Sequence, residues 1–210
     1  RGVEILFADK TGMPKFLGID NLVEGFARNG YPMEIARQRA YSGCHWFALP
    51  GREYAMNDLI KVNFAAVLMA AWEEMFADEA VPPSVARLWV LFEKHLRRAI
   101  EVLAEGIDFH LAHMHQVAPE LVLDLLCHGT IEQGLDASNG GVEFYTLGID
   151  GVALATAADS LAALEQRVER EQRLSWAEIK GYIDSNWAGS EGERARLMMR
   201  SIPRFGSGGS

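Results

Sequence analysis

The longest regular pattern in this sequence lies between two proline-containing segments. Pro82-Pro83-Ser84 is a sequence that begins helices, and Pro119 closes the stretch that follows it. Within this stretch apolar side chains recur at helical spacing, at Trp89, Phe92, Leu96, Ile100, Leu103 and Ile107. We therefore expect one long helix after Ser84, with Gly106 as the position where it would kink or break. Such a helix makes the chain helix-dominated.

The remaining sequence alternates helical patterns with short β-prone runs. Further helices are expected at residues 20–30, 32–40, 57–78, 120–133, 157–169, 175–183 and 191–201, and short strands at residues 3–7, 41–48 and 142–149. Ser175 and Glu178 form a capping box at the start of one of these helices. Strands separated by helices indicate the α/β class. Because three strands do not close a sheet or a barrel, we expect part of the architecture to lie outside these 210 residues.

Charge and cysteine content limit the partners and the compartment. The net charge is -9 with a pI near 5.2, and the sequence contains no run of Lys and Arg, which argues against a nucleic-acid partner. A small-molecule partner is expected instead. No apolar run reaches the roughly 18 residues that a membrane-spanning helix needs. Two cysteines cannot build a disulfide framework, so we expect a reducing cytoplasm.

The segment at residues 41–51, with sequence YSGCHWFALPG, places one of the two cysteines between turn-forming residues. Gly43 precedes Cys44 and Pro50-Gly51 closes the run, which predicts a thiol at the tip of a loop, where a substrate could meet it. A buried free cysteine beside two aromatic residues is the alternative. His45 follows directly, but on an extended run it points away from Cys44, so a Cys–His pair of neighbours is not favoured.

Other chemistry-bearing residues give weaker signals. His110, His113 and His115 have no carboxylate or cysteine at a metal-ligand spacing, so no metal site is expected. The Gly-rich turn at residues 136–141 precedes a strand rather than a helix, which does not fit a phosphate-binding loop. The acids near the two glycine-containing turns are Glu53, Asp58 and Glu143, and each is more often solvated or ion-paired than catalytic.

A series of short motifs, in order along the chain, carries a resemblance to a known family. The motifs are PKF at residues 14–16, AR at 36–37, GC at 43–44, PG at 50–51, GGVEFY at 140–145, ADSLAA at 158–163 and IPRFG at 202–206. Together they cover nearly the whole chain, and the most specific are DSLAA and PRFG. In these motifs the sequence resembles the catalytic subunits of glycyl radical enzymes, the pyruvate formate-lyase group.

This resemblance implies a fold, an active-site residue and partners. Residues 1–201 would form the helix-rich part of a ten-stranded α/β barrel of the pyruvate formate-lyase type, incomplete in this chain, and residues 202–210 a flexible C-terminal tail or linker. Cys44 would be the catalytic cysteine, whose thiyl radical abstracts hydrogen from a small-molecule substrate. No bound cofactor is implied. A glycyl radical is installed in this family by a radical S-adenosylmethionine activase, and the complete enzyme would be a homodimer.

Two departures from the family pattern bear on the reaction. Dehydratases of the family carry Glu two residues after the cysteine, where this chain has Trp46, and pyruvate formate-lyase has a second cysteine where this chain has His45. Trp46 and Phe47 favour an aromatic or apolar carboxylate substrate and a decarboxylase-like lyase, with His45 and Asp58 as further substrate-binding residues. Glu143 is the second candidate catalytic residue. A dehydratase, with Asp58 or Glu143 as the base, and a fumarate-adding synthase remain alternatives.

The loop that carries the radical in this family is a further departure. Its sequence, Arg-Val-x-Gly-Tyr, does not occur in this chain, and neither does the first half of the barrel. We therefore expect either a fragment or a subunit that another chain completes. A non-catalytic scaffold and a helical small-molecule binding module are the alternatives to an enzyme.

Overall fold

The structure is a computed structural model, and it describes residue 4, residue 8, residues 18–42 and residues 46–205. The chain divides into two compact units. The first unit consists of Arg1–Asn57 and Met114–Thr146, and the second consists of Asp58–His113 and Leu147–Ser210. Three elements, β3, β4 and α5, begin in one unit and end in the other.

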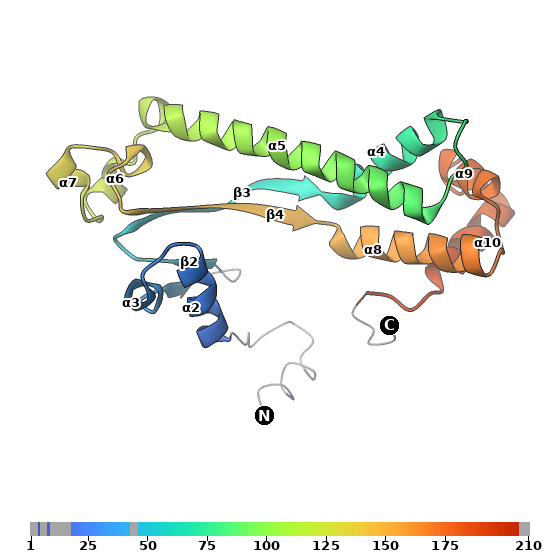
Figure 1. The fold of residues 1–210 in the computed structure, drawn as a ribbon, viewed down its shortest axis with the longest axis horizontal. Coiled ribbons are helices and arrows are strands. Elements are labelled where there is room, and N and C mark those ends of the chain that lie inside the picture. The colour runs from blue at the N-terminus through green and yellow to red at the C-terminus, as the bar shows by residue number, and fades with distance from the viewer. Residues whose placement is uncertain (1–3, 5–7, 9–17, 43–45, 206–210) are drawn as a thin grey trace. The chain divides into compact units, whose positions relative to one another are not determined.

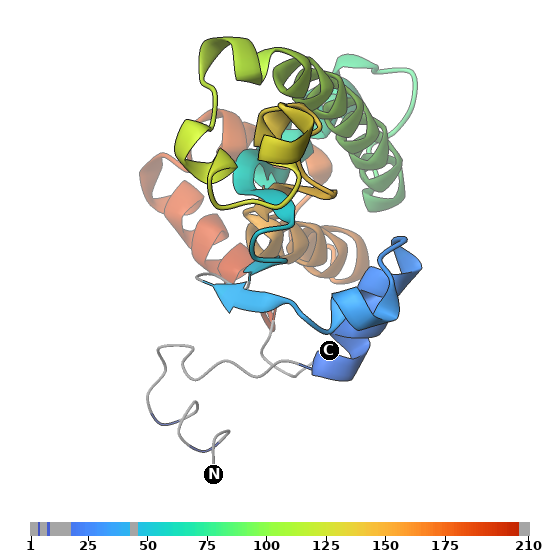
Figure 2. The same cartoon turned by 90° about the vertical axis from the view of Figure 1, so that its left-hand side faces the viewer.

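The first unit contains a small strand pair and several short helices (Figures 1 and 2). Its complete elements are α2 (Ile19–Arg28), α3 (Met33–Ala36), β1 (Ala40–Ser42), β2 (Trp46–Ala48), α6 (Leu121–Asp124), α7 (Thr130–Gln133) and η1 (Ala137–Asn139). Strands β1 and β2 are antiparallel, with Ala40 opposite Ala48. The single strand expected at residues 41–48 is therefore two strands, and residues 43–45 between them lie outside the described residues.

Strands β3 (Glu53–Asn63) and β4 (Phe144–Val152) form a second sheet. The two arrows point the same way in Figure 1, so the pair is parallel. Strand β4 confirms the strand expected at residues 142–149, but β3 corrects the helix expected at residues 57–78, of which only the part from Phe64 onward is helical. Asn63 sets this boundary, because its side chain accepts hydrogen bonds from the first backbone N–H groups of the helix at 3.0 and 3.2 Å.

The second unit is built from longer helices around one apolar core. Its elements are α4 (Phe64–Ala77), most of α5 (Val85–Val117), α8 (Leu154–Ala163), the π-helix η2 (Leu164–Arg170), α9 (Trp176–Asp184) and α10 (Gly189–Arg200). Helix α4 packs on α8, and side chains from all of these elements meet in the core. The long helix is confirmed and runs through Gly106 without a break. The capping box of Ser175 and Glu178 is also confirmed.

The helix expected at residues 120–133 is wrong as one element, because it is divided into α6 and α7. Gly129 separates them with a φ of 100°, a backbone conformation that side chains other than Gly strongly disfavour. The chain folds back closely at this place. A Cβ atom at Gly141 would overlap the carbonyl oxygens of Leu135 and Asp136, so the glycines of this turn allow the approach to β4.

The two ends of the chain were expected to be a strand and a tail. Most of the expected strand at residues 3–7 lies outside the described residues, and Glu4, which is described, is helical. At the other end, Ile202 is buried and the Phe205 backbone N–H donates to Asp159 Oδ1 at 2.8 Å. Ile202 and the Phe205 backbone thus contact the second unit, residues 206–210 lie outside the described residues, and the tail expected at residues 202–210 stays a prediction. Among the described helices, none combines the length and apolar character that crossing a membrane requires.

Candidate functional site

The predicted active-site cysteine belongs to the hairpin region of the first unit. Cys44 and His45 lie outside the described residues, while β1 and β2 are described on either side of them. Trp46 is the first residue of β2, opposite Ser42, and Phe47 follows it; both side chains are half-buried. Phe47 meets the ring of Phe26 edge-on, with the ring centroids 6.4 Å apart. Half-buried aromatic side chains therefore follow residues 43–45 in the sequence, and their contact with a substrate stays a prediction.

Glu53, the first residue of β3, is the most enclosed acid of this region. Its carboxylate is 0% exposed, and Oε2 accepts a hydrogen bond from the Leu49 backbone N–H at 2.7 Å. Its Oε1 accepts one from the Tyr31 hydroxyl at 2.9 Å and another from the Thr146 hydroxyl. Burying a carboxylate is costly unless donors surround it, and here three donors do so. This acid is engaged in holding the fold and has no lone pair facing an open space.

Arg39 is the cation that accompanies Glu53. Its side chain is 3% exposed, and Nη2 lies 3.8 Å from Glu53 Oε1, close enough for an ion pair but too far for a hydrogen bond. The guanidinium lies 2.9 Å from the ring centre of Phe26 and 4.4 Å from that of Tyr31. Within the described part of the chain, none of its three nitrogens has a hydrogen-bond partner. Its compensation is therefore the charge of Glu53 and the faces of two aromatic rings.

Glu143, the second predicted catalytic residue, forms an ion pair with Arg52. Arg52 Nε donates to Glu143 Oε2 at 2.8 Å, and Nη2 donates to the same oxygen. The carboxylate is 46% exposed. Because both hydrogen bonds go to Oε2, Oε1 accepts none from the described residues. The ion pair thus orients this acid and leaves one oxygen available to a substrate or a water molecule.

Asp58, predicted as a substrate-binding residue, belongs to the second unit. It has a φ of 61°, an uncommon conformation for a residue with a side chain. Lys61 donates a hydrogen bond to its carboxylate, which lowers the pKa of Asp58 below its usual value. Asp150, which faces Asp58, has its pKa raised mainly by that contact. Lys61 therefore favours the ionised form of Asp58 at the surface of β3.

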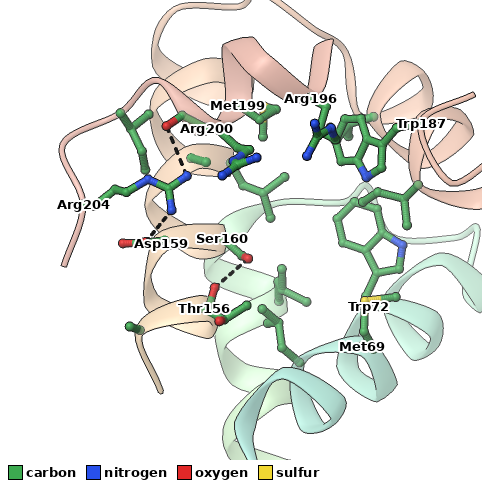
Figure 3. A pocket seen from close by; sticks show the side chains of 18 residues that line it. Met69, Trp72, Thr156, Asp159, Ser160, Trp187, Arg196, Met199, Arg200 and Arg204 are labelled. Atoms are coloured by element: carbon green, nitrogen blue, oxygen red, sulfur yellow. Dashed lines mark hydrogen bonds and ion pairs between the residues drawn. The ribbon is translucent and has the colours of Figure 1, made fainter. Parts of the chain in front are cut away.

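Two motifs that carried the family resemblance meet in the second unit, beside a cavity of about 530 Å³. Asp159 of the DSLAA motif accepts a hydrogen bond from the Phe205 backbone N–H, and its Oδ2 is 3.7 Å from Arg204 Nη1. The cavity wall is mostly apolar, with Trp72 and Trp187 among its residues. Figure 3 shows Arg196, Arg200 and Arg204 along one edge of this cavity. This contact joins the two motifs through Asp159 and Phe205, which are 46 residues apart in the chain.

The histidines of α5 have separate surroundings. His113 Nδ1 lies 2.7 Å from the Phe109 carbonyl oxygen of the same helix, and the two rings stack 4.3 Å apart. His110 lies on the same helix three residues earlier. Among the described residues, no group of three or more His, Cys, Asp and Glu side chains is placed to hold a metal ion.

The cluster of Glu53, Arg39, Tyr31 and Thr146 was only partly indicated by the sequence. The sequence shows Glu53 as an acid near the cysteine loop but does not indicate its partners, because Tyr31 is 22 residues away from it and Thr146 is 93 residues away. One signal was available. An acid placed two residues after a Pro-Gly turn and directly before apolar β-prone residues is a candidate for burial.

Comparisons with known proteins bear on the chain as a whole. A family model described as pyruvate formate lyase-like matches residues 3–209. Among curated proteins, the (2S)-3-sulfopropanediol dehydratase of Klebsiella oxytoca is 24% identical over 208 residues, which cover 93% of this chain and 25% of that protein. The isethionate sulfite-lyase of Desulfovibrio desulfuricans is 26% identical over 214 residues, which cover 94% of this chain and 25% of that protein.

A solved structure gives the corresponding result for the fold. The crystal structure of a glycyl radical enzyme from Archaeoglobus fulgidus has a TM-score of 0.76 at 21% identity, over 90% of this chain and 25% of that chain. This likeness confirms the expected fold class, a helix-rich part of an α/β barrel of this type. The chain spans about a quarter of the length of the curated relatives that it matches.

Proposed function

The chain belongs to the pyruvate formate lyase-like family, and we propose that it supplies the active-site cysteine of a glycyl radical enzyme. The observation that carries this proposal is the family match over residues 3–209, which includes Gly43-Cys44 and the Pro50-Gly51 turn that follows. Cys44 would give the hydrogen atom of its thiol to a glycyl radical, which a radical S-adenosylmethionine activase installs. Cys44 Sγ, now a thiyl radical, would then take a hydrogen atom from a substrate carbon, so that an S–H bond forms again as a C–H bond breaks.

The other cysteine has the properties of a structural residue. Cys127 is buried in the core of the first unit with Tyr54, Ala137 and Val142. Burial, with a smaller contribution from Asp124, raises the pKa of its thiol. A thiol packed in this core has no room for a substrate. This supports the choice of Cys44 as the reacting cysteine.

We infer that the substrate is a small carboxylate with an apolar or aromatic body, cleaved by a lyase reaction of the decarboxylase kind. Trp46 and Phe47 support this choice, because they place large apolar side chains two and three residues after the cysteine, and Trp46 stands where dehydratases of the family have an acid. Phe47 and its neighbour Phe26 would contact the apolar part of such a substrate. His45, the residue next to Cys44, would bind the carboxylate of this substrate.

Glu143 is the acid that we assign to proton transfer. Its oxygen Oε1 is unoccupied by hydrogen-bond donors among the described residues, while Arg52 holds Oε2 and so fixes the side chain. A general base needs this combination of a set orientation and an available lone pair. The assignment of Asp58 as a polar substrate contact stays a prediction from the sequence; in the second unit its carboxylate is paired to Lys61.

Dehydration is a second candidate reaction. It is favoured by a relative, since the sulfopropanediol-processing protein of Klebsiella oxytoca that matches this chain is described as a dehydratase. In this reaction Glu143 would take the proton of the hydroxyl group on the radical carbon and give it to the hydroxyl group of the neighbouring carbon, which would leave as water. Trp46 weighs against it, because it occupies the position of the acid that serves this purpose in family dehydratases.

The proposal is tested with the complete protein after activation. Cys44→Ser is expected to abolish turnover while the glycyl radical signal in electron paramagnetic resonance is retained. Cys127→Ala is the matched control, since it removes the buried thiol and should keep turnover. Turnover that survives in Cys44→Ser would remove Cys44 from the mechanism. A wild-type protein that accepts no radical from the activase would favour a non-catalytic scaffold.

The same preparation separates the two reactions. Arylacetates and vicinal diols would be supplied in parallel, and products identified by mass spectrometry. Release of carbon dioxide from an arylacetate supports the decarboxylase-like lyase, whereas conversion of a diol to an aldehyde supports dehydration. In either case Glu143→Gln should lower turnover more than Glu34→Gln, a change at an exposed acid of α3.

A further inference from the structure

We propose that the Glu53 carboxylate is a positioning residue that holds together the base of the hairpin containing Cys44. This inference rests on the proposed function only for its catalytic consequence. The contacts of Glu53 involve described residues alone. Through them, this one buried acid links both ends of the hairpin to the rest of the first unit.

The hairpin base is defined by the last pair of its two strands. Ala40 of β1 lies opposite Ala48 of β2, so Arg39 and Leu49 are the next residues on the two sides. Glu53 contacts both of them: its Oε2 accepts from the Leu49 N–H at 2.7 Å, and its Oε1 lies 3.8 Å from Arg39 Nη2. One carboxylate thus connects the chain that enters the hairpin with the chain that leaves it.

The same carboxylate attaches the hairpin base to two other segments. The Tyr31 hydroxyl donates to Oε1 from the connection between α2 and α3, and the Thr146 hydroxyl donates to it from β4. All three hydrogen-bond partners are donors, and Arg39 adds a positive charge. An ionised carboxylate satisfies this set best, because hydrogen bonds to a charged group are stronger than neutral ones.

The structure also indicates what substitution would do. In Glu53→Gln, the amide oxygen can still accept from the Leu49 N–H, and the amide nitrogen then faces the hydroxyls of Tyr31 and Thr146, which can rotate and accept. The shape is kept, but the charge that compensates Arg39 is lost. Arg39 then becomes a buried cation without a counter-charge, a situation that is strongly destabilising locally. The hairpin base should open more often while the second unit remains folded.

Hydrogen–deuterium exchange measured by mass spectrometry on the 210-residue chain tests this proposal. In Glu53→Gln, exchange in peptides covering residues 46–50 should become about tenfold faster than in wild type, a factor that corresponds to about 1.4 kcal/mol. Peptides from α9 in the second unit should be unchanged. Glu34→Gln, at an exposed acid, should leave both regions unchanged. Equal acceleration everywhere, or no acceleration at residues 46–50, would overturn the proposal.

Tyr31→Phe provides a milder second variant, in case Glu53→Gln does not fold. It removes one hydrogen bond to Glu53 and keeps the aromatic ring over Arg39, so exchange at residues 46–50 should rise by a smaller factor. If Glu53→Gln did not fold and Tyr31→Phe left the exchange unchanged, the proposal that Glu53 holds the hairpin base would be contradicted.

The catalytic consequence is measured in the complete, activated protein. Glu53→Gln should lower kcat with little change in KM, because it changes the placement of the cysteine rather than a substrate contact. Loss of local protection with unchanged kcat would limit Glu53 to a structural role and overturn the positioning claim. If Cys44→Ser retained turnover while Glu53→Gln still accelerated exchange at residues 46–50, the proposed function would fail. The structural role of Glu53 at the hairpin base would still hold.

Discussion

Leu88 provides a quantitative test of the second unit. It lies on α5, is 0% exposed and belongs to the core cluster with Trp72 and Phe92. Leu88→Ala removes three carbon atoms from this core, which at about 0.8 kcal/mol per buried methylene accounts for about 2.4 kcal/mol. The space left behind adds a further loss, since packed cores relax only partly. We therefore expect unfolding to become easier by about 3 kcal/mol, within the range of roughly 2–5 kcal/mol for such substitutions.

Urea denaturation followed by tryptophan fluorescence measures this loss, because Trp72 and Trp176 lie in or against the same core. Leu197→Ala on α10 is the matched control, since the same atoms are removed from a side chain that is 54% exposed. This control should lose less than about 1 kcal/mol. A loss for Leu88→Ala no greater than that of Leu197→Ala would show that the core around α5 is not packed as described.

Two further predictions concern thiol chemistry and pH. Because burial raises the pKa of Cys127, its alkylation by iodoacetamide should stay slow at pH 8 and accelerate only above the usual thiol range; fast reaction at pH 8, detected by peptide mass spectrometry, would contradict its burial. At the start of α9, hydrogen bonds from the backbone N–H of Ser175 and, to a smaller extent, from its hydroxyl lower the pKa of Glu178. The ionised Glu178 therefore stabilises the folded state at pH values above its unfolded-state pKa of about 4.3. This stabilisation is lost as the pH falls through the lower folded-state pKa. Urea midpoints between pH 6 and pH 3 should therefore fall less in Glu178→Gln than in wild type, and an identical pH dependence would contradict the capping interaction.

Local signals predicted the helices of the second unit well. The length of α5 followed from its apolar period and bounding prolines, and the start of α9 followed from its capping box. Strand β3 was missed, because Leu59 and Ile60 fit the helical period that continues into α4. Its strand conformation depends on pairing with β4, about 90 residues later in the chain, and a local pattern does not contain that information.

The candidate site shows the same limit. Gly43-Cys44 and the aromatic residues after it could be found because they are adjacent in the sequence. Arg39 and Glu53 could not be assigned a role, because the sequence does not show that an acid and a base 14 positions apart are both enclosed. Their relation follows from the β1–β2 register, which places the residues on either side of the hairpin base next to one carboxylate.

The two acids beside the first residues of β3 and β4, Glu53 and Glu143, differ in exposure and in partners. The Phe144 N–H donates to the Arg52 carbonyl oxygen at 3.1 Å, so the strands begin side by side. Arg52 and Glu143 lie just before β3 and β4 and meet at the surface, whereas Glu53, the first residue of β3, is buried. An acid whose oxygens are filled by three donors and a cation cannot also accept a substrate proton. These contacts support the proposals that Glu53 holds the hairpin base and that Glu143, whose Oε1 accepts no hydrogen bond from the described residues, is the acid of this pair that transfers protons.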